Sequence, residues 1–147
     1  MIWGGISLYY GKLPLYIKKS TDSITSELYV NQVLHPIVSN YKGCILIQDG
    51  ATSHTAKKTK EWCENMQIKV MTQSPKSPDM NPIEKIWNLL KNSVQKRSPK
   101  NKEELIEAIQ KSWSEITQQT AENIIYHVVH QVCPKVLDVE GDWIKKF

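Results

Sequence analysis

Two acidic residues, Asp49 and Glu84, have positions from which carboxylates could bind a divalent cation. Asp49 comes after the apolar run 44–47, which follows Gly43 and is typical of a strand buried on both faces in the middle of a sheet. Glu84 stands at the start of an amphipathic helix, with 34 residues between the two acids. That length allows the chain to leave the sheet and return to the same edge. Because Mg²⁺ prefers carboxylate oxygens, two acids delivered there by different elements could form a metal site.

Each acid also has a structural interpretation. Asp49, at the end of a strand, could cap the helix that follows. Asn81 and Glu84 have the spacing of a capping box, and acidic side chains are favourable in the first turn of a helix. Asp79 and Asn81 are interpreted as residues that fix the turn before this helix rather than as metal ligands. The capping and metal-binding roles can coexist.

The segments 48–54, QDGATSH, and 77–87, SPDMNPIEKIW, carry a more specific signal. They resemble the catalytic core of mariner-type transposases, which belong to the DDE superfamily of DNA-cutting and DNA-joining enzymes. The family pattern is close to QDNAPxH followed by SPDLNPIExxW, with the same spacing between Asp and Glu. This chain departs from that pattern at Gly50, Thr52 and Met80. The opening WGG and the late Trp113 also fit, so the resemblance spans nearly the whole chain.

The resemblance implies both a fold and a chemistry. The fold would be RNase H-like α/β, with a mixed sheet flanked by helices. Asp49 and Glu84 would be catalytic residues and metal ligands of a two-metal site that uses Mg²⁺ or Mn²⁺. Such a site suits DNA strand cleavage and strand transfer, the steps of DNA transposition and integration. The family's first catalytic Asp lies upstream of the hairpin, and Asp22, which stands in a helix-start signal beyond the hairpin, is rejected as that ligand.

Residues 1–147 are therefore interpreted as a single, N-terminally truncated catalytic domain, which lacks the first strand and the DNA-binding helix-turn-helix region. With an incomplete two-metal site, this chain alone is predicted to be inactive. The alternative is a catalytically inactive transposase remnant, or a co-opted DNA- or protein-binding module on the same fold. An unrelated nuclease with this fold is a third interpretation.

Basic residues indicate DNA as the partner. The sequence has 19 Lys and Arg against 15 Asp and Glu, a net charge of +4 that is compatible with DNA binding without requiring it. We expect phosphate contacts from the stretch that follows Glu84, although a solvated helix face explains the same pattern. His54 is expected either to touch phosphate or to support Asp49. The resemblance further implies transposon ends and target DNA as partners, a homodimer and a nuclear location. The DNA-binding candidates are His54, Lys85, Lys91, Lys96 and Arg97.

The elements that would position these residues follow from local patterns. Residues 1–17 predict a β-hairpin with Gly11 in its turn and a bulge or close backbone approach at the two glycines after Trp3. A helix is predicted to begin at a cap within residues 21–23, and Pro36 would either kink this helix or end it about a residue earlier. After the central strand we expect a helix near His54 capped by residue 52 or 53, a strand at 68–71, and three further helices. The last of these is predicted to stop at Pro134.

Cysteine content and hydropathy indicate the redox compartment of the protein and its relation to membranes. Three cysteines without a CxxC pair indicate neither a zinc site nor a disulfide framework, and they favour a reducing compartment. No apolar run approaches the roughly 20 residues of a membrane-spanning helix. The sequence thus predicts no membrane partner.

Overall fold

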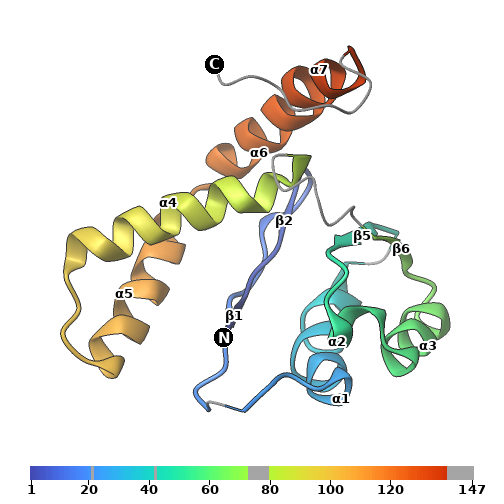
Figure 1. Cartoon of the computed structure of the whole chain (residues 1–147), viewed down its shortest axis with the longest axis horizontal. Coiled ribbons are helices and arrows are strands. Elements are labelled where there is room, and N and C mark those ends of the chain that lie inside the picture. Colours follow the sequence, from blue (N-terminus) through green and yellow to red (C-terminus); the bar gives the residue numbers. More distant parts are fainter. Residues whose placement is uncertain (21, 42, 73–79, 139–147) are drawn as a thin grey trace. The chain divides into compact units, whose positions relative to one another are not determined.

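The computed structural model describes residues 1–20, 22–41, 43–72 and 80–138 (Figure 1). The chain divides into two compact units. The first holds residues 1–3 and 16–77, and the second holds residues 4–15 and 78–147. Among the helices of the described ranges, none has the length and apolar character needed to cross a membrane.

The predicted N-terminal hairpin is present. β1 (Ile2–Trp3) pairs antiparallel with β4 (Tyr16–Ile17) in the first unit, and β2 (Ile6–Ser7) pairs with β3 (Gly11–Lys12) in the second. The turn is made by residues 8–10, so Gly11 begins β3 with a φ of 67° instead of lying within the turn. The close approach predicted after Trp3 is confirmed. A Cβ added at Gly4 would lie 2.7 Å from the ring of Trp113.

The first helix begins later than predicted. α1 (Ser26–Tyr29) is capped by Thr25, whose side chain accepts a hydrogen bond from the backbone N–H of Leu28. The carbonyls of Asp22 and Ser23 accept hydrogen bonds from Lys18 Nζ, which holds that stretch outside the helix. α1 continues into a π-helical turn (Val30–Leu34) and ends before Pro36, which is one of the two outcomes predicted for this proline. A short 3-10 helix (Val38–Asn40) follows.

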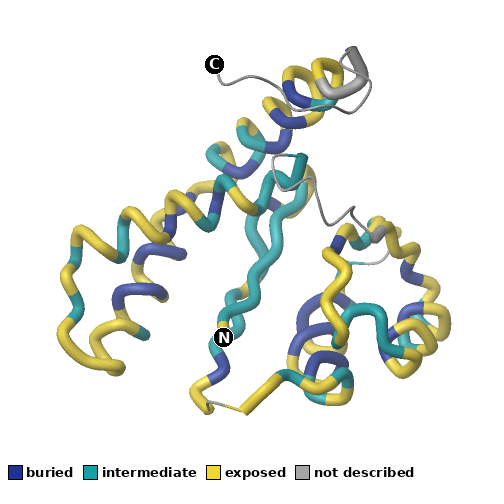
Figure 2. Tube along the Cα trace, viewed as in Figure 1, coloured by how far each residue is buried: buried dark blue, intermediate teal, exposed yellow. Residues whose placement is uncertain are grey.

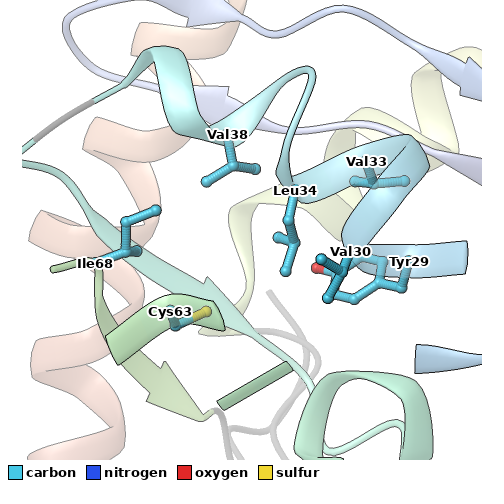
Figure 3. Close-up of a cluster of buried hydrophobic side chains, with 7 residues drawn as sticks. All are labelled: Tyr29, Val30, Val33, Leu34, Val38, Cys63 and Ile68. Atoms are coloured by element: carbon cyan, nitrogen blue, oxygen red, sulfur yellow. The ribbon is translucent and has the colours of Figure 1, made fainter. Parts of the chain in front are cut away.

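The core of the first unit lies between α3 (Lys57–Asn65) and the helical segment that begins with α1 (Figure 3). Five of its buried side chains come from residues 29–38, and Cys63 of α3 and Ile68 complete the cluster. Burial raises the pKa of the Cys63 thiol, which keeps it protonated and apolar in character. The members are Tyr29, Val30, Val33, Leu34, Val38, Cys63 and Ile68.

The central strand differs from its prediction. β5 (Ile45–Gln48) pairs in parallel with β6 (Lys69–Thr72), which is its only ladder partner among the described residues. Ile45 and Ile47 are 48% and 57% exposed, so burial on both faces is wrong. An apolar run indicates a strand but not how many neighbours that strand will find. Both pairing directions of the predicted mixed sheet occur, in separate two-stranded sheets.

The second unit is built from helices around the hairpin tip. α4 (Pro82–Arg97) packs against α5 (Lys102–Glu115) and α6 (Gln118–His127), and α6 also contacts β2 and β3. Buried positions recur at helical spacing along all three helices (Figure 2). Trp87 stacks on Trp113 with ring centroids 5.6 Å apart. Trp113 is a buried core residue, as predicted, whereas Trp87 is only half-buried.

Pro134 does not stop the last helix. α6 continues through a π-helical turn (Val128–Val132) into α7 (Cys133–Asp138), which contains Pro134. Cys133 N–H bonds to the carbonyl of Val128, five residues back. Pro134 therefore lies in the first turn after a shift in hydrogen-bond register, a position where a missing N–H is tolerated.

Candidate active site

Asp49 is placed by the end of β5. Gln48, the last residue of the strand, is buried, and Asp49 follows it at the carboxyl end of a parallel pair. Residues beyond the carboxyl ends of parallel strands are where α/β sheets commonly bind ligands. α2 (Thr52–Thr55) then begins after Ala51 without a side-chain cap, and α3 begins after Ala56, so the predicted capping by residue 52 or 53 is wrong.

The two oxygens of the Asp49 carboxylate differ in their surroundings. Oδ1 accepts a hydrogen bond from the backbone N–H of Ala51 at 3.1 Å and lies 2.7 Å from Nδ1 of His54. Within the described residues of the first unit, Oδ2 has no partner. The Asp49 side chain is 67% exposed, whereas that of His54 is only 17% exposed. One oxygen of the largely exposed Asp49 carboxylate is thus hydrogen-bonded, and the other has no partner in the described part of the first unit.

A buried polar pair lies behind His54. The Tyr29 hydroxyl donates to Oε1 of Gln48 at 2.9 Å, and Nε2 of Gln48 donates to the backbone carbonyl of His54 at 3.4 Å. The rings of Tyr29 and His54 lie 4.5 Å apart between centroids. Burial raises the pKa of the Tyr29 phenol, so this hydroxyl stays protonated and able to donate at neutral pH.

No role in this site was predicted for Tyr29 or Gln48. The available signal was Gln48 itself, a polar residue that ends an otherwise apolar strand directly before an acid. A buried amide must find hydrogen-bond partners, and here it finds them in Tyr29 and His54.

Glu84 is placed by the start of α4, in the second unit. Asn81 caps this helix by accepting from the N–H of Ile83 at 3.3 Å, and Pro82 occupies the first helical position, as predicted. The Glu84 carboxylate makes no return bond to Asn81, so the capping box is not formed. The carboxylate is exposed and has no hydrogen-bond partner in the described part of its unit. Asp79 lies outside the described residues.

The basic residues of α4 separate into two groups. Lys91 lies about two turns after Glu84 on the same side of the helix, and both are exposed. Lys85 and Lys96 lie on an adjacent stripe. Arg97 is engaged within the protein. One of its terminal nitrogens lies 2.6 Å from both carboxylate oxygens of Glu115, and its Nε donates to the Ser112 hydroxyl at 3.1 Å.

The structure therefore brings Asp49 and His54 together and places Glu84 and Lys91 along one face of a helix. Because the first pair and the second pair belong to different units, a joint site of Asp49 and Glu84 stays a prediction. Within the ranges described, no group of three or more His, Cys, Asp or Glu side chains is arranged so that it could hold a metal ion. The two acids remain candidate ligands by their exposure and their oxygen chemistry.

Comparison with known families decides the assignment. Residues 2–106 match the family model of the DDE superfamily endonucleases. The chain belongs to this family. The match covers well over half of the chain and includes both segments from which the resemblance to mariner-type transposases was drawn.

Relatives of this chain include transposases of Caenorhabditis transposable elements. It is 24% identical over 143 residues to the Tcb2 transposase of Caenorhabditis briggsae, covering 96% of this chain and 52% of the relative. It is 31% identical over 96 residues to the Tc3 transposase of Caenorhabditis elegans, covering 61% and 28% of the two chains. The chain thus spans about half the length of the Tcb2 transposase.

Solved structures confirm the RNase H-like fold. The catalytic domain of the Mos1 mariner transposase superposes with a TM-score of 0.79 at 15% sequence identity, covering 92% of this chain and 71% of that domain. The same catalytic domain with Raltegravir and Mg gives a TM-score of 0.78 at 15% identity, covering 92% and 72%. At this identity the likeness establishes the fold.

Proposed function

We propose that this DDE endonuclease is part of the catalytic domain of a mariner-type transposase, which cleaves DNA and transfers strands with the help of Mg²⁺ or Mn²⁺. The observation that carries the proposal is the exposed Asp49 carboxylate at a strand end, which is oriented by His54 through one oxygen. Membership of the DDE superfamily of endonucleases supports a role for this carboxylate in DNA cleavage.

The residues present fit a divalent cation. Asp49 and Glu84 both offer exposed carboxylate oxygens, the ligands that Mg²⁺ and Mn²⁺ prefer. When bound, a pair of such ions supplies activation of the attacking hydroxyl and stabilisation of the leaving oxygen in phosphodiester cleavage. Asp49 and Glu84 would hold the ions, while His54 and the Ala51 N–H orient the Asp49 carboxylate. Two solved relatives in fold contain Mg and Mn.

DNA is the proposed substrate. Lys91 stands on the same face of α4 as Glu84. A DNA backbone with one phosphate bound to Lys91 would therefore extend along that face toward Glu84. Lys85 and Lys96 add positive charge on the adjacent stripe. Transposon ends and target DNA as partners, a homodimer and a nuclear location belong to the same proposal, which rests on the transposase relatives.

This chain alone is proposed not to cut DNA, because the family's site uses a third acid that precedes the hairpin. Asp22 does not supply it, since it lies in the loop between β4 and α1, where its carbonyl binds Lys18. The two carboxylates of this chain would bind cations with an incomplete ligand set. We therefore expect weak metal binding without strand cleavage.

A nicking assay tests this proposal. Supercoiled plasmid is incubated with the 147-residue chain and Mn²⁺, and with the Glu84→Ala variant as a matched control. We expect no open-circular product above background from either protein. In parallel, Mn²⁺ binding by the wild type should be lost in Asp49→Asn and in Glu84→Ala. Nicking that disappears with Glu84→Ala would overturn the expected inactivity, and Mn²⁺ binding that is indifferent to both changes would overturn the metal site.

A further inference from the structure

We infer that His54 is a positioning residue, which selects Oδ2 of Asp49 as the oxygen offered to a cation, and that the buried Tyr29–Gln48 pair holds His54 in that role. The inference rests on the proposed function, because it concerns how Asp49 would bind metal. Its four residues come from three elements of the first unit: α1, the end of β5 and α2.

The hydrogen bonds of Asp49 carry the first step. Oδ1 has two neighbours, the Ala51 N–H at 3.1 Å and His54 Nδ1 at 2.7 Å. Two donors satisfy the lone pairs of one carboxylate oxygen, so Oδ1 has little capacity left for a cation. Oδ2 is the oxygen that remains. Asp49 is thereby arranged as a ligand through one oxygen, and a symmetric grip through both oxygens is disfavoured.

The chemistry of the contact fixes the tautomer of His54. An ionised carboxylate can only accept hydrogen bonds, so Nδ1 must carry the proton at a separation of 2.7 Å. In a neutral ring, Nε2 is then the unprotonated nitrogen. A histidine that donates to a ligating carboxylate orients that carboxylate and tunes its basicity, as outer-shell partners do at metal sites.

The support of His54 is buried and connected. Tyr29 is 1% exposed and Gln48 is 8% exposed, and their hydrogen bond is 2.9 Å long. Gln48 also donates to the backbone carbonyl of His54, while the Tyr29 ring lies against the imidazole. Both the backbone and the ring of His54 are thus restrained from the core side. This explains why a strand that is otherwise apolar ends in a buried amide.

The tautomer can be measured directly and without metal. Long-range ¹H–¹⁵N correlation spectra of the full chain at about pH 9, where free imidazole is neutral, report which ring nitrogen of His54 carries the proton. We expect the pattern of an Nδ1–H ring, and we expect it to be lost in Asp49→Ala. An Nε2–H ring in the wild type would overturn the inference, whatever the metal affinity is.

Mn²⁺ titration of the full chain tests the positioning role. We expect His54→Ala to weaken Mn²⁺ binding at least about tenfold, the usual effect of losing an outer-shell partner. His54→Asn should restore most of the affinity, because its amide N–H can replace the Nδ1 donor. Thermal unfolding of each variant shows whether the fold is intact.

The outcomes separate this inference from the proposed function. Wild-type affinity in His54→Ala, with binding lost in Asp49→Asn, would overturn the positioning role alone. Equally weak binding by His54→Asn and His54→Ala would contradict the donor argument. If Asp49→Asn binds Mn²⁺ as the wild type does, the proposed metal site fails, and the tautomer then decides whether His54 orients Asp49. Tyr29→Phe, which keeps the ring and removes the hydroxyl, should lower the affinity less than His54→Ala does.

Discussion

At the scale of single residues, the two acids have different local chemistry. Asp49 takes part in the turn after β5 through Oδ1 and still presents Oδ2, so the structural and ligand roles predicted for it can coexist. Glu84 makes no capping bond, and its carboxylate is fully available at the helix start. The positive end of the α4 dipole is a favourable place for an acidic side chain.

The basic residues after Glu84 give a residue-scale prediction with a matched control. Lys91→Ala should weaken binding to any DNA sequence and lower the slope of log affinity against log salt by about 1, because one phosphate contact is lost. Arg97→Ala should leave that slope nearly unchanged, since its guanidinium already binds Glu115 and Ser112. Fluorescence anisotropy over a salt series measures both.

The Arg97 control has its own pH signature. The hydrogen bond from Arg97 holds the pKa of Glu115 below its ordinary value of 4.5. Because the folded pKa is lowered, the stabilisation by this pair is present above the ordinary value and is lost as the pH falls through the lowered one.

A lowered salt slope in Arg97→Ala with none in Lys91→Ala would reverse the assignment of these two residues.

At the scale of elements, sequence patterns predicted those features of helices and strands that depend only on neighbouring residues in the chain. The start of α4 was predictable because Asn81 and Pro82 suit the cap and the first helical position whatever surrounds them. The burial of β5 was not, because it depends on neighbouring strands that a run of four apolar residues does not specify. The continuation of the last helix past Pro134 was not predicted. The π-helical turn before it changes which backbone N–H groups take part in helical hydrogen bonds. The Tyr29–Gln48 pair joins distant segments and left no periodic pattern.

The hairpin gives an element-scale prediction. Gly4→Ala should destabilise the protein by about 1–3 kcal/mol, the usual cost of overpacking, because the new methyl group would lie 2.7 Å from Trp113 and 2.9 Å from Trp87. Gly50→Ala is the control, since nothing lies within 4 Å of its added Cβ. Thermal or urea unfolding measures the difference. Equal stability of the two variants would show that the tryptophan pair yields without cost.

At the scale of the whole molecule, family and fold were predictable because two spaced segments carry most of the signal. The match over residues 2–106 and the likeness to the Mos1 catalytic domain confirm both. The division into two units was not foreseen, and it places Asp49 in one unit and Glu84 in the other. The functional claim therefore requires these units to bring the two acids to one cation. The spacing of the acids in the sequence is compatible with such a site but does not by itself bring them together.

Paramagnetic broadening by Mn²⁺ tests this claim most directly. Substoichiometric Mn²⁺ is added to the ¹⁵N-labelled full chain, and the loss of backbone amide signals is recorded residue by residue. We predict that Gly50 and Ala51 in the first unit and Glu84 and Lys85 in the second lose intensity together, and that Asp49→Asn abolishes both effects. Broadening confined to the Asp49 loop, with the start of α4 unaffected, would contradict a shared site.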